Sequence, residues 1–284
     1  MSAFSVLMSV YYKERAEFLC QSLDSVFAQT LPPSEVVLVE DGPLTPALDT
    51  VIERYQSEHR ELKVVRLPVN GGLGKALNEG LKHCTHDIVA RMDTDDVAMP
   101  ERFHRQVMYM DSHRDVSVCG SWIAEFLDLP DNIVSVRTVP ESHDDIYRFG
   151  QRRNPVNHPS VAFRKKAVDH AGGYQDFPLF EDYYLWVRML MDGAKFHNIA
   201  EPLLRFRLSS DMYRRRGGWR YAKTEFRFQR TLMGLGYVTP LRFASNLALR
   251  VLPRVVPNQV RARIYGALRK APGEKRQIDL RGRS

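Results

Sequence analysis

The chain has 284 residues, of which 44% are hydrophobic and 26% charged, with 17 glycines and 16 prolines, a composition that fits a globular α/β protein and excludes disordered, collagen-like and coiled-coil chains. Its three cysteines show no CxxC spacing, which argues against a disulfide framework or a structural zinc site and favours a reducing cytosol. The first residues lack the basic region of a signal peptide, and no apolar run reaches the roughly 18 residues of a spanning helix, so we expect a protein that is neither exported nor integral to a membrane.

Short β-branched runs alternate with helical patterns in the first hundred residues. We expect strands at 5–9, 35–39, 63–67 and 88–92, and helices at 15–29, 46–58 and 75–84. Connections this short force a mainly parallel sheet with helices on both faces, so the predicted fold class is α/β and doubly wound. Ligands bind such sheets beyond the carboxyl ends of the strands, and the unusual polar residues fall there.

The pattern beyond residue 100 is more mixed. We expect helices at 100–113, 165–171 and 181–191, strands at 116–122 and 160–163, a loop at 154–159, a turn at 172–174 and further helices from 219 onward.

The formal net charge of +7 is concentrated at the C-terminal end of the chain. Residues 250–284 contain ten Lys or Arg against two acidic residues, whereas the first 249 residues are close to neutral. Such a tail points to an anionic partner, and because the body has no basic stripe for nucleic acid we expect a membrane surface instead. Residues 241–270 mix apolar residues with arginines at roughly helical intervals, so this segment either packs on the body or lies in a membrane interface.

Three carboxylates follow the strand expected at 88–92: Asp93, Asp95 and Asp96. Their mutual repulsion would be costly without a cation, and Mg²⁺ or Mn²⁺ takes oxygen ligands of this kind together with diphosphate oxygens. The alternative is that they solvate a turn or cap the helix near Pro100. The run DTDDV also resembles the nucleophile motif of haloacid-dehalogenase-like phosphatases, but that motif belongs to a first strand and here three β-α units precede it.

Two further features at strand ends suit an anionic nucleotide. NGGLGK at residues 70–75 lacks the spacing of a P-loop, so its glycines either supply only a turn with positive φ or let a phosphate approach the N-terminus of the following helix. Asp41, after the second strand, is either a turn residue or an acceptor for the N–H groups of a base.

The second half holds two more polar clusters. NHPS at residues 157–160 precedes an expected strand, and Glu181 and Asp182 open the helix at 181–191. Carboxylates in a first helical turn are often only dipole partners or caps. In a partly desolvated cleft, however, one of them can act as a general base toward a sugar hydroxyl. Trp186 lies on the apolar face of this helix, where a core position is expected.

In combination and in this order, seven motifs resemble those of the family 2 glycosyltransferases of the GT-A fold, particularly bacterial enzymes of exopolysaccharide, capsule or O-antigen assembly. They are SVLMSVYYKE, EVVLVEDGP, NGGLGKALNEGL, MDTDDVAMPERF, NHPSVAFRK, GGY and FEDYYLWVRML, and they cover about residues 4–210. The resemblance implies an inverting transferase that binds a nucleoside diphosphate sugar, with a UDP-sugar favoured, through residues 1–100 and a saccharide acceptor through 101–215. Residues 216–284 would be a helical, basic extension. The QxxRW motif of processive synthases is missing, which favours single additions.

The motif positions, together with the loop at 70–75, give the candidate site residues. Nucleotide-sugar binding is expected at Ser9, Tyr11, Glu14, Asp41, Asn70, Gly72, Lys75 and Asp93. Mn²⁺ or Mg²⁺ would be held by Asp95, Asp93 and Asp96. Asp182 would be the catalytic base, with Glu181 as the second choice. Acceptor or diphosphate contacts are expected at His158, Trp186 and Arg215.

The resemblance also implies partners and a location. The acceptor would be linked to a polyprenyl diphosphate, and the C-terminal region would hold the protein peripherally on the cytoplasmic face of the membrane. A membrane-associated subunit that binds nucleotide sugars without catalysis is the alternative.

Overall fold

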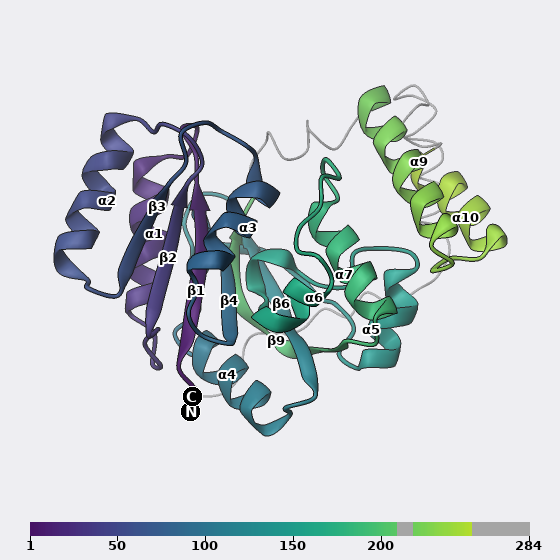
Figure 1. Ribbon diagram of the computed structural model, residues 1–284, viewed down its shortest axis with the longest axis horizontal. Coiled ribbons are helices and arrows are strands. Elements are labelled where there is room, and N and C mark those ends of the chain that lie inside the picture. Colours follow the sequence, from purple (N-terminus) through teal and green to yellow (C-terminus); the bar gives the residue numbers. More distant parts are fainter. Residues whose placement is uncertain (209–217, 252–284) are drawn as a thin grey trace.

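The computed structural model describes residues 1–208 and 218–251 (Figure 1). The strands are β1 (Phe4–Val10), β2 (Glu35–Glu40), β3 (Leu62–Arg66), β4 (Ile88–Asp93), β5 (Val97–Ala98), β6 (Val116–Phe126), β7 (Ile133–Arg137), β8 (Ala162–Arg164) and β9 (Lys195–Arg207). The α-helices are α1 (Ala16–Phe27), α2 (Pro46–Glu58), α3 (Leu73–His83), α4 (Arg102–Ser112), α5 (His143–Gly150), α6 (Lys165–His170), α7 (Glu181–Met191), α9 (Gly218–Gly234) and α10 (Pro240–Asn246). A 3₁₀ turn, η1 (His158–Ser160), and a π turn, η2 (Leu247–Val251), complete the set.

One sheet runs through the body in the order β3-β2-β1-β4-β8-β6-β9-β5, and β7 pairs with β6. The strands from β3 to β4 are parallel, as are β6 and β9, and β8 joins the two groups through antiparallel pairs. The carboxyl ends of β1, β2 and β4 therefore meet at one edge of the sheet, where the candidate residues follow them.

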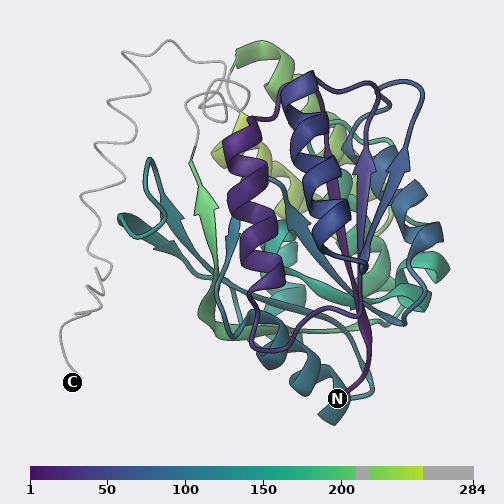
Figure 2. The ribbon, with the colours of Figure 1, turned by 90° about the vertical axis from the view of Figure 1, so that its left-hand side faces the viewer.

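Alternate residues of the first strands enter two separate cores, because successive side chains of a strand point to opposite faces. Leu7 of β1 packs in the cluster that contains buried residues of α3, α6 and α7, while its neighbours Val6 and Met8 pack in the cluster with α1, α2 and α4. Figure 2 shows α1 and α2 side by side on one face of the sheet. Each buried aliphatic side chain contributes about 1.5–3 kcal/mol. The predicted α/β class with helices on both faces is confirmed.

The first half follows the sequence prediction closely, and α2 and α7 have the predicted bounds. The second half departs from it. The strands β5, β7 and β9 and the helix α5 were not predicted, and the strand expected at 160–163 is the turn η1 followed by β8. The long strand β9 was missed because three register irregularities in its pairing with β6 break the alternation of buried and exposed residues that reveals a strand.

The C-terminal region is helical as far as it is described, through α9, α10 and η2. None of the helices in residues 1–208 and 218–251 has the length and hydropathy that a membrane crossing requires. The predicted domain boundary at 215 and most of the basic tail lie outside the described residues, so both stay predictions.

Candidate active site

Three carboxylates gather in the turn between β4 and β5. Asp93, Asp95 and Asp96 each offer one oxygen within 4.8 Å of the others. Asp93 is the last residue of β4, and Asp96 is fully buried. The short strand β5 that follows pairs with β9, which holds the turn on its far side. The sequence prediction that these three side chains come together is confirmed.

A buried guanidinium lies next to Asp93. Arg91 is two residues earlier on β4 and 1% exposed, and it forms an ion pair with both carboxylate oxygens of Asp93 (Nη1–Oδ2 2.9 Å). The buried Arg102 donates to the carbonyl of Arg91 at 2.6 Å and so anchors this strand to α4. A buried guanidinium is costly without a partner, and Asp93 provides that partner. Because both carboxylate oxygens take part in the pair, the orientation of the Asp93 carboxylate is fixed.

The acidic turn carries more negative charge than its described surroundings neutralise. Burial, with the charges of Asp93 and Glu14, raises the pKa of Asp95 to about 7. Burial and the charge of Asp95 raise the pKa of Asp96 well above its ordinary value. Asp96 Oδ1 accepts from the N–H of Arg207 at 2.9 Å, but its buried Oδ2 has no partner among the described residues. Clustered carboxylates with an orphaned oxygen fit a hard divalent cation such as Mg²⁺ or Mn²⁺.

Arg207, the last residue of β9, ties the acidic turn to α1. Its Nε donates to the main-chain carbonyl of Asp95 at 2.9 Å and its Nη2 to Gln21 Oε1 at 2.6 Å. Its guanidinium also lies 3.8 Å from the centroid of the Phe18 ring, a cation–π contact. Arg207 contacts Asp95 through its main-chain carbonyl, so this hydrogen bond does not involve the Asp95 carboxylate.

The loop after β1 lies against the same turn. The Thr94 hydroxyl is 3.1 Å from Glu14 Oε2 and 3.3 Å from the carbonyl of Ser9. Burial raises the pKa of Glu14, and the charge of Asp93 adds to this effect. The side chain of Tyr11 is exposed, and its main-chain carbonyl accepts a hydrogen bond from the N–H of Glu14 at 2.9 Å. The structure thus brings these predicted nucleotide-binding residues to the acidic turn.

Asp41 clamps the glycine-rich loop. Its Oδ1 accepts from the N–H of Gly71 at 2.7 Å, its Oδ2 from the N–H of Gly72 at 3.0 Å, and its carbonyl from the side chain of Asn70 at 3.0 Å. With both oxygens engaged and the side chain 3% exposed, Asp41 shapes this loop, and its contact with a base stays a prediction. Lys75, in the first turn of α3, is exposed.

Gly42→Ala is expected to destabilise the protein by about 3 kcal/mol. Gly42 has a φ of +83°, and a Cβ there would lie 2.6 Å from the backbone nitrogen of Asn70, so the substitution adds a clash to the cost of about 1–2 kcal/mol for a left-handed residue. Gly193→Ala is the matched control, since its φ is also +83° but a Cβ meets nothing within 4 Å. Urea unfolding measures both, and equal losses would contradict the argument.

The predicted base lies at the start of α7. Asp182 Oδ2 accepts from Asn154 Nδ2 at 2.6 Å. Burial raises the pKa of Asp182, and the hydrogen bonds from the Tyr183 N–H and from Asn154 oppose the rise. Burial and the charge of Asp182 also raise the pKa of Glu181. The N-cap of the helix is Phe180, so neither carboxylate is the cap. A carboxylate with a raised pKa that an amide orients is suited to accept a proton.

Arg91 and Tyr174 connect the acidic turn with the start of α7. The Arg91 guanidinium acts electrostatically on both Asp93 and Asp182. Burial is the main cause that raises the pKa of the Tyr174 hydroxyl, and the charges of Asp182 and Asp93 raise this pKa further. A Cβ on Gly74, in the first turn of α3, would lie 3.5 Å from that of Tyr174 and 3.8 Å from that of Glu181. Carboxylates about ninety residues apart in the sequence therefore share one neighbourhood.

The three residues predicted to contact the acceptor or diphosphate differ in where they lie. His158 is 8% exposed, and its Nε2 is 2.9 Å from the hydroxyl of Tyr174. Burial, followed by the charge of Arg91, lowers the pKa of His158 well below its usual value, which keeps it neutral. Trp186 is fully buried in the core, where it contacts His158 and Phe196. A side chain without exposed surface cannot touch an acceptor, so that role for Trp186 is wrong. Arg215 lies outside the described residues.

Four functional neighbours were not predicted: Arg91, Asn154, Tyr174 and Arg207. Only Arg91 had a signal in the sequence, a charged residue inside an otherwise apolar strand and two positions before an aspartate on the same face. The other three reach the site through tertiary contacts that no local pattern shows.

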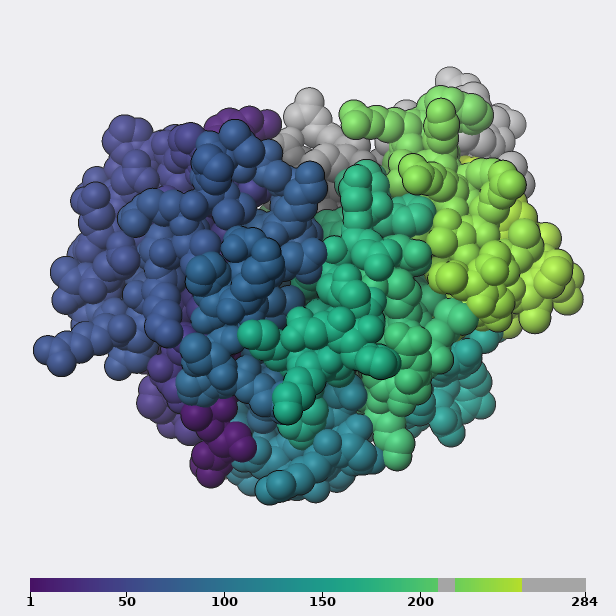
Figure 3. Space-filling model, in the orientation of Figure 1, coloured from purple at the N-terminus to yellow at the C-terminus, as the bar shows by residue number. Residues whose placement is uncertain are grey.

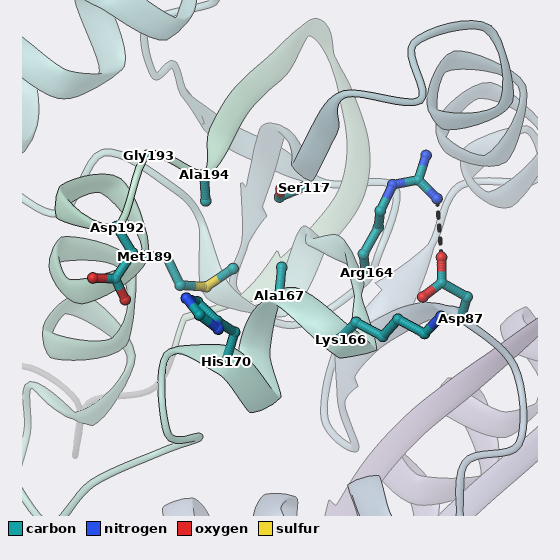
Figure 4. A pocket seen from close by; sticks show the side chains of 10 residues that line it. All are labelled: Asp87, Ser117, Arg164, Lys166, Ala167, His170, Met189, Asp192, Gly193 and Ala194. Atoms are coloured by element: carbon teal, nitrogen blue, oxygen red, sulfur yellow. Dashed lines mark hydrogen bonds and ion pairs between the residues drawn. The ribbon is translucent and has the colours of Figure 1, made fainter.

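A cavity of about 380 Å³ lies at the other end of β4 (Figure 4). Arg164, His170 and Asp192 are among its lining residues, and Arg164 pairs with Asp87 at 3.1 Å. Asp87 directly precedes β4 and Asp93 ends it, so about 20 Å of strand separates this cavity from the acidic turn. It is therefore distinct from the candidate active site.

Comparison with known proteins places these features in context. Residues 5–172 match the model of the family described as Glycosyl transferase family 2. The chain is 41% identical over 267 residues to the amylovoran biosynthesis glycosyltransferase AmsE of Erwinia amylovora, covering 94% of this chain and 99% of that protein. It is 37% identical over 262 residues to the UDP-Gal:alpha-D-GlcNAc-diphosphoundecaprenol beta-1,3-galactosyltransferase of Escherichia coli, covering 92% and 94%.

The fold has solved counterparts. The mannosyltransferase PcManGT from Pyrobaculum calidifontis, solved in complex with GDP-Man and Mn²⁺, superposes with a TM-score of 0.62 at 17% identity, covering 95% of this chain and 76% of that one. The two chains therefore share their overall fold.

Proposed function

Because this chain belongs to the family 2 glycosyltransferases, we propose that it is an inverting enzyme that moves a sugar from a nucleoside diphosphate sugar to a hydroxyl of a saccharide acceptor. One observation carries the proposal. The buried Arg91 is paired with Asp93 of the acidic turn, and its charge also acts on the carboxylate of Asp182 at the start of α7. A donor held at the turn and an acceptor held at α7 would meet between them.

In the proposed mechanism, Asp182 removes the proton of the acceptor hydroxyl as that oxygen attacks the anomeric carbon from the face opposite the diphosphate. Its raised pKa and the hydrogen bond from Asn154 prepare it for that role. Asp93, Asp95 and Asp96 would hold Mg²⁺ or Mn²⁺, whose contribution when bound is to neutralise charge on the departing diphosphate. Direct displacement of this kind needs no covalent intermediate.

The relatives narrow the proposed substrates. The Escherichia coli relative is named for a UDP-sugar donor and a diphosphoundecaprenol-linked acceptor, and the Erwinia relative for amylovoran biosynthesis. We therefore favour a UDP-sugar donor, a polyprenyl diphosphate-linked acceptor and a role in surface polysaccharide assembly. Such an acceptor would place the enzyme peripherally on the cytoplasmic face of the membrane.

Nucleotide sugars offered one at a time to the purified full-length protein test the proposal. We expect a UDP-sugar to raise the melting temperature by about 5 °C or more at a hundredfold excess over its dissociation constant, with Mn²⁺ and not without it, and to be turned over with a lipid-linked saccharide. Stabilisation without any sugar transfer would favour the alternative, a subunit that only binds the donor. Absence of a response to every nucleotide sugar would contradict both.

A further inference from the structure

The helix α9 has a second, exposed face in addition to the one that packs on the body. Its buried residues include Tyr221, Glu225, Phe228 and Leu232. A different stripe carries Trp219 and Phe226, seven residues apart and 74% and 43% exposed. Because seven residues are nearly two helical turns, these two rings lie on one side of the helix. A single exposed apolar side chain is ordinary, but several that adjoin form the kind of patch that marks an interaction surface.

The neighbouring helical segment, formed by α10 and η2, is exposed along an apolar stripe as well. Leu241 and Leu249 are 82% and 63% exposed, and the exposed positions between them are Ala244 and Ala248. Their spacing of three, four and one residues places them on one face. α9 and α10 lie side by side at one end of the molecule (Figures 1 and 3), and Phe226 meets Phe243 of α10 at 6.1 Å between ring centroids.

The exposed charged residues of α9, α10 and η2 are basic. Residues 218–251 contain six Lys or Arg and one acidic residue, Glu225. Glu225 is fully buried and paired with Arg250 at 2.9 Å. The exposed basic residues Arg220, Lys223 and Arg230 belong to the same helix as Trp219. The chain that follows, residues 252–284, adds nine Lys or Arg against two acidic residues.

These helices are attached firmly to the part of the body that carries the proposed base. Phe228 of α9 stacks on Phe180, the N-cap of α7, at 4.7 Å, and also contacts Tyr183 at 4.8 Å. Asn246 of α10 donates to the carbonyl of Gln151 at 2.8 Å. The exposed stripes are therefore held in a fixed relation to the first turn of α7.

We propose that Trp219, Phe226, Leu241 and Leu249, with the surrounding basic residues, form a docking face for an anionic lipid bilayer. Exposed aromatic and aliphatic side chains enter the boundary between headgroups and acyl chains, while arginines and lysines contact lipid phosphates. The inference rests on the proposed function to this extent: docking through helices that pack on α7 would present Asp182 to an acceptor embedded in the same bilayer.

Co-sedimentation of the full chain with vesicles tests the docking face without any substrate. We expect the protein to bind vesicles of phosphatidylglycerol and phosphatidylcholine, and to bind pure phosphatidylcholine far more weakly. The double variant Trp219→Ser/Leu241→Ser should lower the partition coefficient at least about tenfold. The double variant Lys223→Ser/Arg230→Ser, which removes two positive charges, should lower the partition coefficient about thirtyfold at low salt. Leu129→Ser, at a 69% exposed leucine between β6 and β7, is the matched control and should change nothing.

Two outcomes would overturn the proposal. Unchanged vesicle binding by the Trp219→Ser/Leu241→Ser variant would assign lipid binding to residues 252–284 instead. A wild-type dimer that the same variant dissociates, without vesicle binding, would make the face a contact between two copies. The melting temperatures of the two double variants are compared with that of Leu129→Ser, and equal values exclude misfolding. Binding of a UDP-sugar in the absence of lipid is measured separately, so failure of the docking face and failure of the proposed function are distinguishable.

Discussion

Asp182→Asn is expected to lower the rate of sugar transfer about 10²- to 10⁴-fold while leaving donor binding within about twofold of the wild type. The range is the usual contribution of general acid–base catalysis, and donor affinity should persist because the acidic turn is untouched. The hydrogen bond from Asn154 Nδ2, at 2.6 Å, can be kept by the new amide oxygen, so the fold should hold. Single-turnover kinetics with a defined acceptor and a separate titration of the donor measure the two quantities.

Glu181→Gln is the control for this assignment. Glu181 is the neighbouring carboxylate, also with a raised pKa, and it should retain most of the activity if Asp182 is the base. Near-normal turnover in Asp182→Asn combined with a large loss in Glu181→Gln would exchange the two roles. Near-normal turnover in both variants would remove α7 from the chemistry altogether.

Asp95→Asn is expected to have opposite effects on activity and on stability. It should lower metal-dependent transfer about 10³-fold or more, because a carboxylate that we propose to hold the divalent ion is lost. In the absence of metal, however, the same substitution should raise the melting temperature at pH 8, since it removes a charge that Asp93 and Glu14 repel. Mn²⁺ should then stabilise the wild type and leave the variant unchanged. Thermal unfolding with and without Mn²⁺ measures both effects.

The pH dependence of that stability follows from the pKa. The pKa of Asp95 is about 7 in the folded chain, against an ordinary value of 3.8, so ionisation costs the folded state more than the unfolded one. The cost is fully present above pH 7 and is relieved as the pH falls from 7 toward 4, and its upper limit is about 4 kcal/mol. The advantage of Asp95→Asn should therefore shrink over that range. A constant difference between pH 8 and pH 5 would rule out this explanation.

The parallel half of the fold and its acidic turn could be predicted because their signals are local. Short β-branched runs, a proline that opens a helix at Pro46, and the motif around Asp93 each occupy a few neighbouring residues. Parallel pairing then brings the strand ends together without further information. The helix α7 was predicted with its observed bounds from its amphipathic pattern, and the family resemblance added the choice of Asp182 over Glu181 as the proposed base.

The rest depended on contacts that the sequence does not display. The strand β9 alternates poorly because it shifts register against β6, and Arg207 at its end reaches the acidic turn from more than a hundred residues away. Trp186 was counted among the acceptor-side residues from its position in a motif, although its helix face packs inward. Asp41 shows the same limit, because only the folded loop reveals that both of its oxygens hold backbone amides.

The shared guanidinium of Arg91 couples what would otherwise be two independent evolutionary adjustments. It is paired with Asp93, where we propose that the donor binds, and it also lowers the proton affinity of Asp182, the proposed base for the acceptor. A change of donor preference that alters Asp93 would release that positive charge and so shift the pH at which the acceptor is activated. Relatives that diverge in their nucleotide preference should then carry compensating substitutions near Asp182, and transplanting one end of the site alone should give a chimera with a displaced pH optimum.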